Sequence, residues 1–139
     1  MSRIAYVNGR YVPHAAASVA IDDRGYQFGD GVYEVAAVYA RMLLDFPAHL
    51  DRLHSSWAAL RMAAPAPPKA IELICYETLA RNRVEEGIVY LQVTRGVATR
   101  EHGFPKGPLK PAFVVTAKAA AWPTAATSDL GLEIITTPE

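Results

Sequence analysis

The chain has 139 residues, of which 51% are hydrophobic and 20% charged, a composition typical of one globular domain and unlike that of a disordered or fibrous protein. Fourteen basic and fourteen acidic residues cancel at pH 7, so no long-range positive field favours nucleic acid or an anionic membrane surface. We therefore expect no nucleic-acid partner. No run of about 18 apolar residues is present, so we also expect no membrane span.

The first part of the chain is predicted to form two β-hairpins with a loop between them. Asn8 and Gly9 lie between the two β-prone runs of IAYVNGRYV, and this pair accepts the positive φ of a tight hairpin turn. Glycines and acidic residues predict a loop over Asp22–Asp30. β-branched and aromatic residues then predict a strand over Val32–Tyr39, which we expect to pair with Leu43–Phe46.

Two amphipathic helices are predicted to follow. Pro47 suits the first turn of a helix, which should end before the proline-rich segment 65–68. The second helix ends in a basic last turn at Arg81 and Arg83, which complements the helix dipole. Apolar spacings of three and four predict that the core-facing residues are Leu50, Leu53, Trp57, Leu60 and Ala64 in the first helix and Ile71, Ile74, Cys75, Thr78 and Leu79 in the second.

The last part of the chain is predicted to contain two strands, a linker and the start of a second domain. The strands Ile88–Arg95 and Ala112–Lys118 flank a proline- and glycine-rich loop, and loops of this length often carry function. The aperiodic, small-residue segment 120–129 is typical of a linker. We therefore expect a small N-terminal α/β domain over residues 1–119 and, over residues 130–139, the first strand of a truncated second domain.

These elements predict an α/β fold of the α+β kind. Because the hairpins and the helix pair are local in sequence, we expect a mixed, largely antiparallel sheet with two helices on one face. The order of the strands is not predicted. An isolated domain of this kind would expose apolar surface, so we also expect self-association.

The segment GYQFGDGVYE is the first candidate for a binding site. Its glycines allow the backbone to turn sharply or to approach a ligand closely. Tyr33 could then project its phenol from a rigid strand into a cleft. A simple connection from loop to strand is the alternative explanation.

The segment HLDR is the second candidate. His49 and Arg52 are three residues apart on a predicted helix, so both can meet the same anion. The planar fork of Arg52 is well suited to a phosphate group, to which it can donate two parallel hydrogen bonds. Polar pairs at this spacing also occur on solvated helix faces, and this alternative stays open.

The third candidate is Arg100-Glu101-His102 in the long loop. In extended backbone, side chains two residues apart point to the same side, so Arg100 and His102 could converge on one carboxylate while Glu101 faces away. Gly103 and Pro105 would limit the freedom of the loop and reduce the entropy lost on binding. A basic pair in a solvated surface loop is the alternative.

Several kinds of site are not predicted. Cys75 lies in an apolar helix stripe, where a core role is more typical than a nucleophilic one, and a lone cysteine without a secretory signal indicates a cytoplasmic protein. The four histidines show no metal-ligand spacing, so we expect no metal. No P-loop, GxGxxG or Ser-His-Asp set is present, and nothing in the chain supplies covalent chemistry on its own.

The segments IAYVNGRYVP, GYQFGDGVYEV, HLDRL, YLQVTRG and TREHGFP together resemble the N-terminal domain of the fold-type IV pyridoxal-phosphate enzymes. This group contains D-amino acid and branched-chain amino acid transaminases and aminodeoxychorismate lyase. The resemblance covers essentially the whole chain, in the order and spacing of the family. The RxH segment resembles that of the D-amino acid transaminases, since the branched-chain enzymes arrange this loop differently.

The resemblance implies a transaminase that transfers an amino group between D-amino acids of the D-alanine type and 2-oxo acids, with pyridoxal phosphate as cofactor. It implies that Tyr33 lies near the substrate and that Arg52 binds the cofactor phosphate. It further implies a homodimer in which Arg100 and His102 reach the partner's site and hold the substrate carboxylate.

The Schiff-base lysine of this family lies in the second domain, beyond a strand that resembles Gly131–Thr137. We therefore expect no catalytic residue in this chain, which would be an N-terminal fragment without activity of its own. Two alternatives stay open. The intact protein could be another fold-type IV enzyme, an aminodeoxychorismate lyase or an R-selective amine transaminase, or the chain could be a freestanding, non-catalytic module that binds a carboxylate or pairs with another chain.

Overall fold

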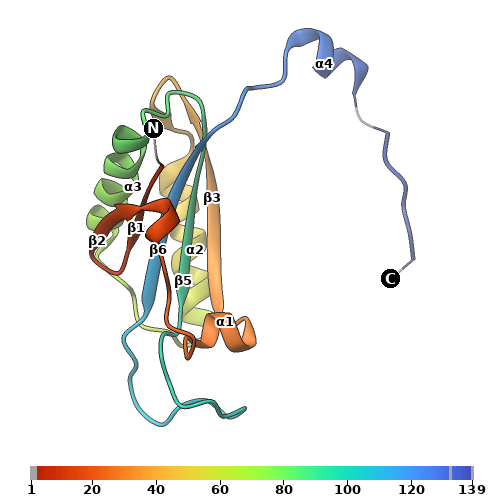
Figure 1. Ribbon diagram of the computed structural model, residues 1–139. Coiled ribbons are helices and arrows are strands. Elements are labelled where there is room, and N and C mark those ends of the chain that lie inside the picture. Colours follow the sequence, from red (N-terminus) through yellow and green to blue (C-terminus); the bar gives the residue numbers. More distant parts are fainter. Residues whose placement is uncertain (1–2, 132, 139) are drawn as a thin grey trace.

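Two long helices cover one face of an antiparallel sheet (Figure 1). The computed structural model describes residues 3–131 and 133–138. Its elements in chain order are β1 (Ile4–Val7), β2 (Arg10–Pro13), the 3-10 helix η1 (His14–Ala16), α1 (Arg24–Phe28), β3 (Gly31–Tyr39), β4 (Met42–Leu43), α2 (Phe46–Ala59), α3 (Pro68–Asn82), β5 (Gly87–Thr94), β6 (Ala112–Ala119) and α4 (Ala125–Leu130). Within the described residues, six strands pair antiparallel in the order β2-β1-β6-β5-β3-β4, which confirms the predicted fold class.

The N-terminal hairpin forms at the Asn-Gly turn, as predicted. Asn8 and Gly9 have φ angles of 48° and 97°, the left-handed backbone that a tight two-residue turn requires. The side-chain oxygen of Asn8 accepts a hydrogen bond from the backbone N–H of Phe113 at 2.7 Å, and the backbone N–H of Asn8 donates to the Phe113 carbonyl at 2.9 Å. The turn therefore joins β1 to β6 as well as to β2.

The three central strands alternate between a helix-facing side and an open side. Ala36 of β3 lies opposite Val89 of β5, and Val89 lies opposite Ala117 of β6. The period of two that predicted the strands therefore also decides which side chains form the core. The core residues contributed by these strands are Ala36, Val38, Val89, Leu91, Val93, Phe113, Val115 and Ala117.

The first long helix, α2, packs against β3 with a shorter apolar face than predicted. The expected core positions Leu60 and Ala64 are wrong, because the helix ends at Ala59 and both side chains are exposed. Arg61 has a φ of 53°, which turns the chain out of the helix. The apolar residues that α2 buries fully or partly are Phe46, Leu50, Leu53 and Trp57.

The second long helix, α3, buries the face that its sequence predicts. It ends at Asn82, where Arg83 takes a left-handed φ of 54°. Burial raises the pKa of the Cys75 thiol, which keeps it protonated and confirms a core role for this residue. The buried residues of α3 are Ile71, Cys75, Thr78 and Leu79, with Ile74 partly buried beside them.

The segment Asp22–Asp30, expected to be a loop, contains the short helix α1. The Asp23 side chain accepts a hydrogen bond from the backbone N–H of Gly25 at 2.8 Å and caps the helix, and Gly29 ends it with a φ of 65°. A helix of five residues is too short to show an apolar period in the sequence. It is held by a tertiary contact, since the Thr94 hydroxyl donates to Asp23 at 2.9 Å.

The C-terminal segment also differs from its prediction. Part of the expected linker forms α4, which lies apart from the sheet (Figure 1). The strand predicted over residues 130–139 is absent from the described residues, because Leu130 ends α4 and no residue after it pairs with a strand. Without a neighbouring strand, the backbone hydrogen-bonding groups of a β-segment have no partner. Positions 132 and 139 lie outside the described residues, and the division into two domains stays a prediction.

The face of the sheet opposite α2 and α3 carries exposed aromatic side chains. Tyr33 and Tyr39 of β3 are 64% and 54% exposed. Tyr90 of β5 stacks on Tyr33, with 5.7 Å between the ring centres. Apolar surface is therefore exposed, as expected, while self-association stays a prediction.

Candidate functional site

His49 and Arg52, which their spacing placed on one face of α2, both contact the carboxylate of Glu34 in β3. Arg52 donates from Nε to Oε1 at 2.5 Å and from Nη2 to Oε2 at 2.6 Å, a bidentate ion pair. Nδ1 of His49 lies 2.8 Å from Oε2. The two side chains converge on one anion, as predicted, and within this chain that anion is Glu34. We call these three residues the Glu34 cluster.

Glu34 is a candidate that the sequence analysis missed. The hydrogen bond from Arg52 lowers the pKa of Glu34, burial opposes this shift, and a hydrogen bond from His49 adds to it. The carboxylate is therefore ionised at neutral pH. A signal for it was present in the sequence: by strand alternation Glu34 lies on the same side as Ala36 and Val38, where a buried carboxylate needs a cationic partner.

The Arg52 side chain is held at one edge and open at the other. It is 67% exposed, whereas the Glu34 side chain is only 4% exposed. An arginine has five N–H donors, and the hydrogen bonds found in the described residues use those on Nε and Nη2 of Arg52. The two donors on Nη1 remain for an external anion. A phosphate group fits this edge, because the buried carboxylate has already fixed the plane of the guanidinium.

Tyr33 lies on the side of β3 opposite to Glu34. It projects from the open face of the sheet, as a residue next to an inward-facing one must. β4 pairs only with Val38 and Tyr39, so in the described residues the earlier part of β3 is an edge of the sheet. A ligand along this edge could be reached by Tyr33 from one face and by Arg52 from the other.

Arg100 and His102 lie in the loop between β5 and β6 and meet at Phe28 of α1. The guanidinium carbon of Arg100 is 5.4 Å from the centre of the Phe28 ring, and the His102 ring centre is 5.6 Å from it. The chain bends at both residues, so the extended backbone assumed from the sequence is wrong. Both side chains are exposed, and each contacts the same aromatic ring.

The structure does not join the two groups of candidates. Among residues 3–131 and 133–138, no hydrogen bond, ion pair or ring contact links the Glu34 cluster with Arg100 or His102. The assignments of Tyr33, Arg52, Arg100 and His102 to substrate and cofactor therefore stay predictions.

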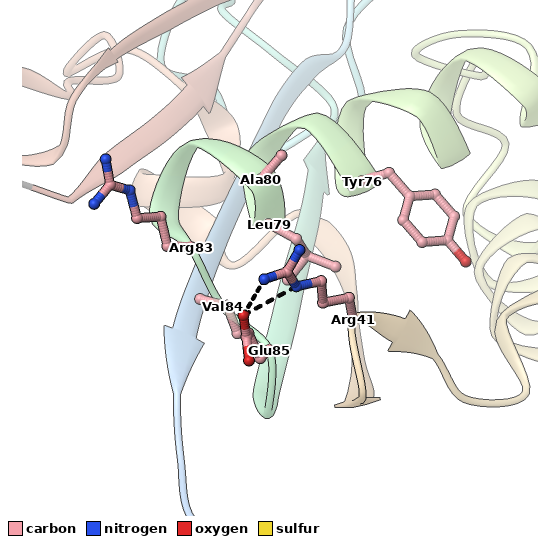
Figure 2. A pocket seen from close by; sticks show the side chains of 7 residues that line it. All are labelled: Arg41, Tyr76, Leu79, Ala80, Arg83, Val84 and Glu85. Carbon is pink, nitrogen blue, oxygen red and sulfur yellow. Dashed lines mark hydrogen bonds and ion pairs between the residues drawn. The ribbon is translucent and has the colours of Figure 1, made fainter.

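A cavity of about 570 Å³ lies away from all of these residues (Figure 2). Arg41 in its wall is already paired with Glu85, and Arg83 points away from that pair. Arg83 also lines the cavity and makes no ion pair among the described residues. It is lined by Arg41, Tyr76, Leu79, Ala80, Arg83, Val84 and Glu85.

Neither a metal cluster nor a membrane span is found in the described part of the chain. In residues 3–131 and 133–138, no three side chains of His, Cys, Asp or Glu lie close enough together to hold a metal ion. No helix in the same ranges is both long and apolar enough to cross a bilayer.

The sequence is similar to a known family and to named relatives. The sequence model described as amino-transferase class IV matches residues 31–139. A D-alanine aminotransferase of Listeria innocua is 42% identical over 100 residues, which are 71% of this chain and 35% of that protein. A D-alanine aminotransferase of Staphylococcus haemolyticus is 33% identical over 114 residues, which are 82% of this chain and 40% of that protein.

Solved structures share the fold. The branched-chain amino acid aminotransferase of Escherichia coli superposes with a TM-score of 0.77 at 18% identity, over 90% of this chain and 42% of that one. The 4-amino-4-deoxychorismate lyase from Pseudomonas aeruginosa gives a TM-score of 0.64 at 25% identity, over 83% and 39%. The chain thus spans about two fifths of the length of these relatives. It belongs to the amino-transferase class IV family.

Proposed function

We propose that the intact protein is a pyridoxal-phosphate-dependent aminotransferase that transfers an amino group between D-amino acids of the D-alanine type and 2-oxo acids. The family match supports the reaction class, and the two D-alanine aminotransferases at 42% and 33% identity support the substrate class. The structural observation that carries the proposal is the contact of both Arg100 and His102 with Phe28, because it keeps a guanidinium and an imidazole beside one ring, and both groups can donate hydrogen bonds to an amino acid carboxylate.

The Glu34 cluster is proposed to hold the cofactor phosphate. Arg52 would donate from Nη1 to a phosphate oxygen, while Glu34 and the helix keep the guanidinium in one orientation. Tyr33 would lie near the substrate at the same sheet edge. The bound cofactor supplies the electron sink that makes the Cα proton of the amino acid acidic.

Arg100 and His102 are proposed to hold the α-carboxylate of the substrate in the site of a partner subunit. Their side chains are exposed and make no contact with the Glu34 cluster of their own chain within the described residues, which supports a shared site in a homodimer. Holding the carboxylate orients the Cα proton toward the catalytic base. The protein would work in the cytoplasm, where the buried free thiol of Cys75 is kept reduced.

The Schiff-base lysine is proposed to lie beyond Glu139, so that residues 1–139 alone would be inactive. The coverage of about two fifths of each relative supports this. Mixing this chain with pyridoxal phosphate and reducing with borohydride should then attach the cofactor to no single lysine. Stoichiometric attachment at one lysine would contradict the proposal.

The test of function uses the full-length protein with its cofactor. Incubation with D-alanine and 2-oxoglutarate should produce pyruvate, whereas L-alanine should produce little. If a primary amine that lacks a carboxylate serves as amino donor as well as D-alanine does, the protein is an R-selective amine transaminase. Pyruvate release from aminodeoxychorismate without an amino acceptor would indicate the lyase, and either result would overturn the proposal.

A further inference from the structure

Arg24 of α1 is nearly buried and contacts three different groups. Its Nε donates to Oδ2 of Asp30 at 2.7 Å, and its Nη1 donates to the backbone carbonyl of Glu101 at 2.9 Å. Its guanidinium carbon lies 4.7 Å from the centre of the Phe28 ring. The side chain is only 4% exposed. A guanidinium buried to this extent is tolerated because Asp30 supplies the opposite charge and because Nε and Nη1 donate hydrogen bonds.

Asp30 fixes Arg24 together with a second arginine, Arg95. Arg95 donates from Nε to Oδ2 at 2.7 Å and from Nη2 to Oδ1 at 2.9 Å. Burial would raise the pKa of Asp30, but hydrogen bonds from Arg95 and Arg24 outweigh it and lower the pKa below its ordinary value. The carboxylate is thus ionised and shared by two guanidiniums. We call these three residues the Asp30 cluster.

The Asp30 cluster reaches into the loop that carries Arg100 and His102. Arg95 places its guanidinium carbon 4.8 Å from the centre of the Phe104 ring. Among the described residues, the hydrogen bond from Arg24 to the Glu101 carbonyl is the only one found that involves any residue of the segment 100–102. The carbonyl of Glu101 belongs to the peptide group that leads into His102, so holding it restricts the backbone between Arg100 and His102.

Phe28 completes the arrangement. Its ring is contacted by Arg24, Arg100 and His102. An aromatic ring attracts cations through its negative face, so it can hold the guanidiniums of Arg24 and Arg100 near one another although like charges repel. The Asp30 cluster contains two cations and one anion, and its excess positive charge also favours an approaching carboxylate.

We propose that Arg24 is a positioning residue for substrate recognition, which holds the Glu101 carbonyl and so places Arg100 and His102 for the substrate carboxylate. This inference rests on the proposed carboxylate role of Arg100 and His102. Arg24 itself does not touch the substrate. Its bond to Glu101 reduces the number of loop conformations, so that a larger fraction of molecules presents Arg100 and His102 together before the substrate binds, and this preorganisation increases affinity.

The test is the substitution Arg24→Lys in the full-length holoenzyme. Lysine keeps a positive charge beside Asp30 but lacks the fork that binds Asp30 and Glu101 at once. The KM for D-alanine and the inhibition constant of propionate, a simple carboxylate, should both rise by about tenfold, with kcat at saturation changed less than about twofold. The cofactor absorbance should stay the same. Arg41→Lys, in an exposed ion pair with Glu85, is the matched control and should change none of these values.

A second measurement does not depend on turnover. Hydrogen exchange of the backbone amides in residues 98–104 should become faster in Arg24→Lys and stay unchanged in Arg41→Lys. If Arg24→Lys fails to fold, Arg24→Gln provides the same test, since it leaves Asp30 paired with Arg95 and removes the guanidinium that binds the Glu101 carbonyl. It should raise the KM for D-alanine in the same direction.

The outcomes separate this inference from the function on which it rests. If Arg100→Ala leaves the KM for D-alanine unchanged, the carboxylate role itself is wrong. If Arg100→Ala raises the KM but a folded Arg24→Lys or Arg24→Gln variant changes neither the KM nor the exchange of residues 98–104, the positioning role of Arg24 is wrong and the carboxylate role stands.

Discussion

Two buried carboxylates of this chain are bound by arginines, and they differ in where those arginines lie. Glu34 binds Arg52, whose side chain is 67% exposed. Asp30 binds Arg24 and Arg95, whose side chains are 4% and 11% exposed. Glu34 is thus buried while its arginine faces solvent. Asp30 and both of its arginines are largely shielded from solvent.

This difference predicts two different uses of the same ion pair. An exposed guanidinium held by a buried carboxylate has free donors for a ligand, which suits cofactor binding by Arg52. The enclosed guanidiniums bind backbone instead, since Arg24 donates to the Glu101 carbonyl and Arg95 to the Leu60 carbonyl. The Glu34 cluster is therefore expected to matter for binding, and the Asp30 cluster for stability and for the shape of the loop.

The largest expected effect is on stability, from Asp30→Asn. This substitution leaves two enclosed guanidiniums without an anion, and breaking a buried ion pair in this way costs about 3 to 5 kcal/mol. Urea denaturation of the full-length protein measures the loss. Glu85→Gln, which removes an exposed partner, is the control and should be nearly neutral. A loss from Asp30→Asn as small as that of the control would show that the two clusters do not differ in the proposed way.

The next largest effect is expected on substrate affinity, from Arg100→Ala. Loss of a charge-assisted contact with a carboxylate should raise the KM for D-alanine by about a hundredfold. The absorbance of the bound cofactor should not change, because Arg100 makes no contact with the Glu34 cluster in the described residues. Unchanged steady-state kinetics would contradict the carboxylate role.

A smaller effect is expected on cofactor retention, from Arg52→Ala. The phosphate loses one cationic contact, and the dissociation constant of pyridoxal phosphate should rise by roughly tenfold. Dialysis followed by absorbance measurement checks this. Arg81→Ala, which removes an exposed arginine paired with Glu77 on α3, is the control. A variant at Arg52 that keeps its cofactor as the wild type does would rule out the phosphate role.

The smallest effect is expected from pH. Because the folded pKa values of Asp30 and Glu34 lie below their ordinary values of about 4, their stabilising contribution is fully present above that pH. It is lost as pH falls through the lowered folded pKa values. Between pH 7 and pH 5 the titration of these two groups should therefore change the melting temperature little. At pH values under about 4 the melting temperature should decrease. In Glu34→Gln this acid-induced decrease should be less steep, and an equal slope in both proteins would count against the ionised Glu34 pair.

Sequence patterns predicted most of the secondary structure because the relevant signals are local. The Asn-Gly pair predicted the turn between β1 and β2, and apolar periods of two and of three to four predicted the central strands and the two long helices. The patterns failed where the signal was too short or needed a partner. α1 has five residues, and the strand expected at the C-terminus has no neighbour among the described residues.

The candidate site was predicted only in part for the same physical reason. The i, i+3 spacing of His49 and Arg52 was enough to place both on one helix face, but it did not reveal that their shared anion is Glu34. Arg100 and His102 were predicted to converge, yet for a reason that the structure replaces. The chain bends at both, and each contacts Phe28, which no local pattern connects with them, so their convergence on a carboxylate stays a prediction.

The sequence by itself determined the fold class, the strands and helices of the core, and the residue types available for binding anions, because these depend on local conformation and on side-chain chemistry. Only the tertiary structure decided which cations meet which carboxylates. Arg52 is 18 positions from Glu34, and Arg24 is 77 positions from Glu101. Contacts across such separations arise when burial of the core brings strands and helices together, and no spacing along the chain encodes them.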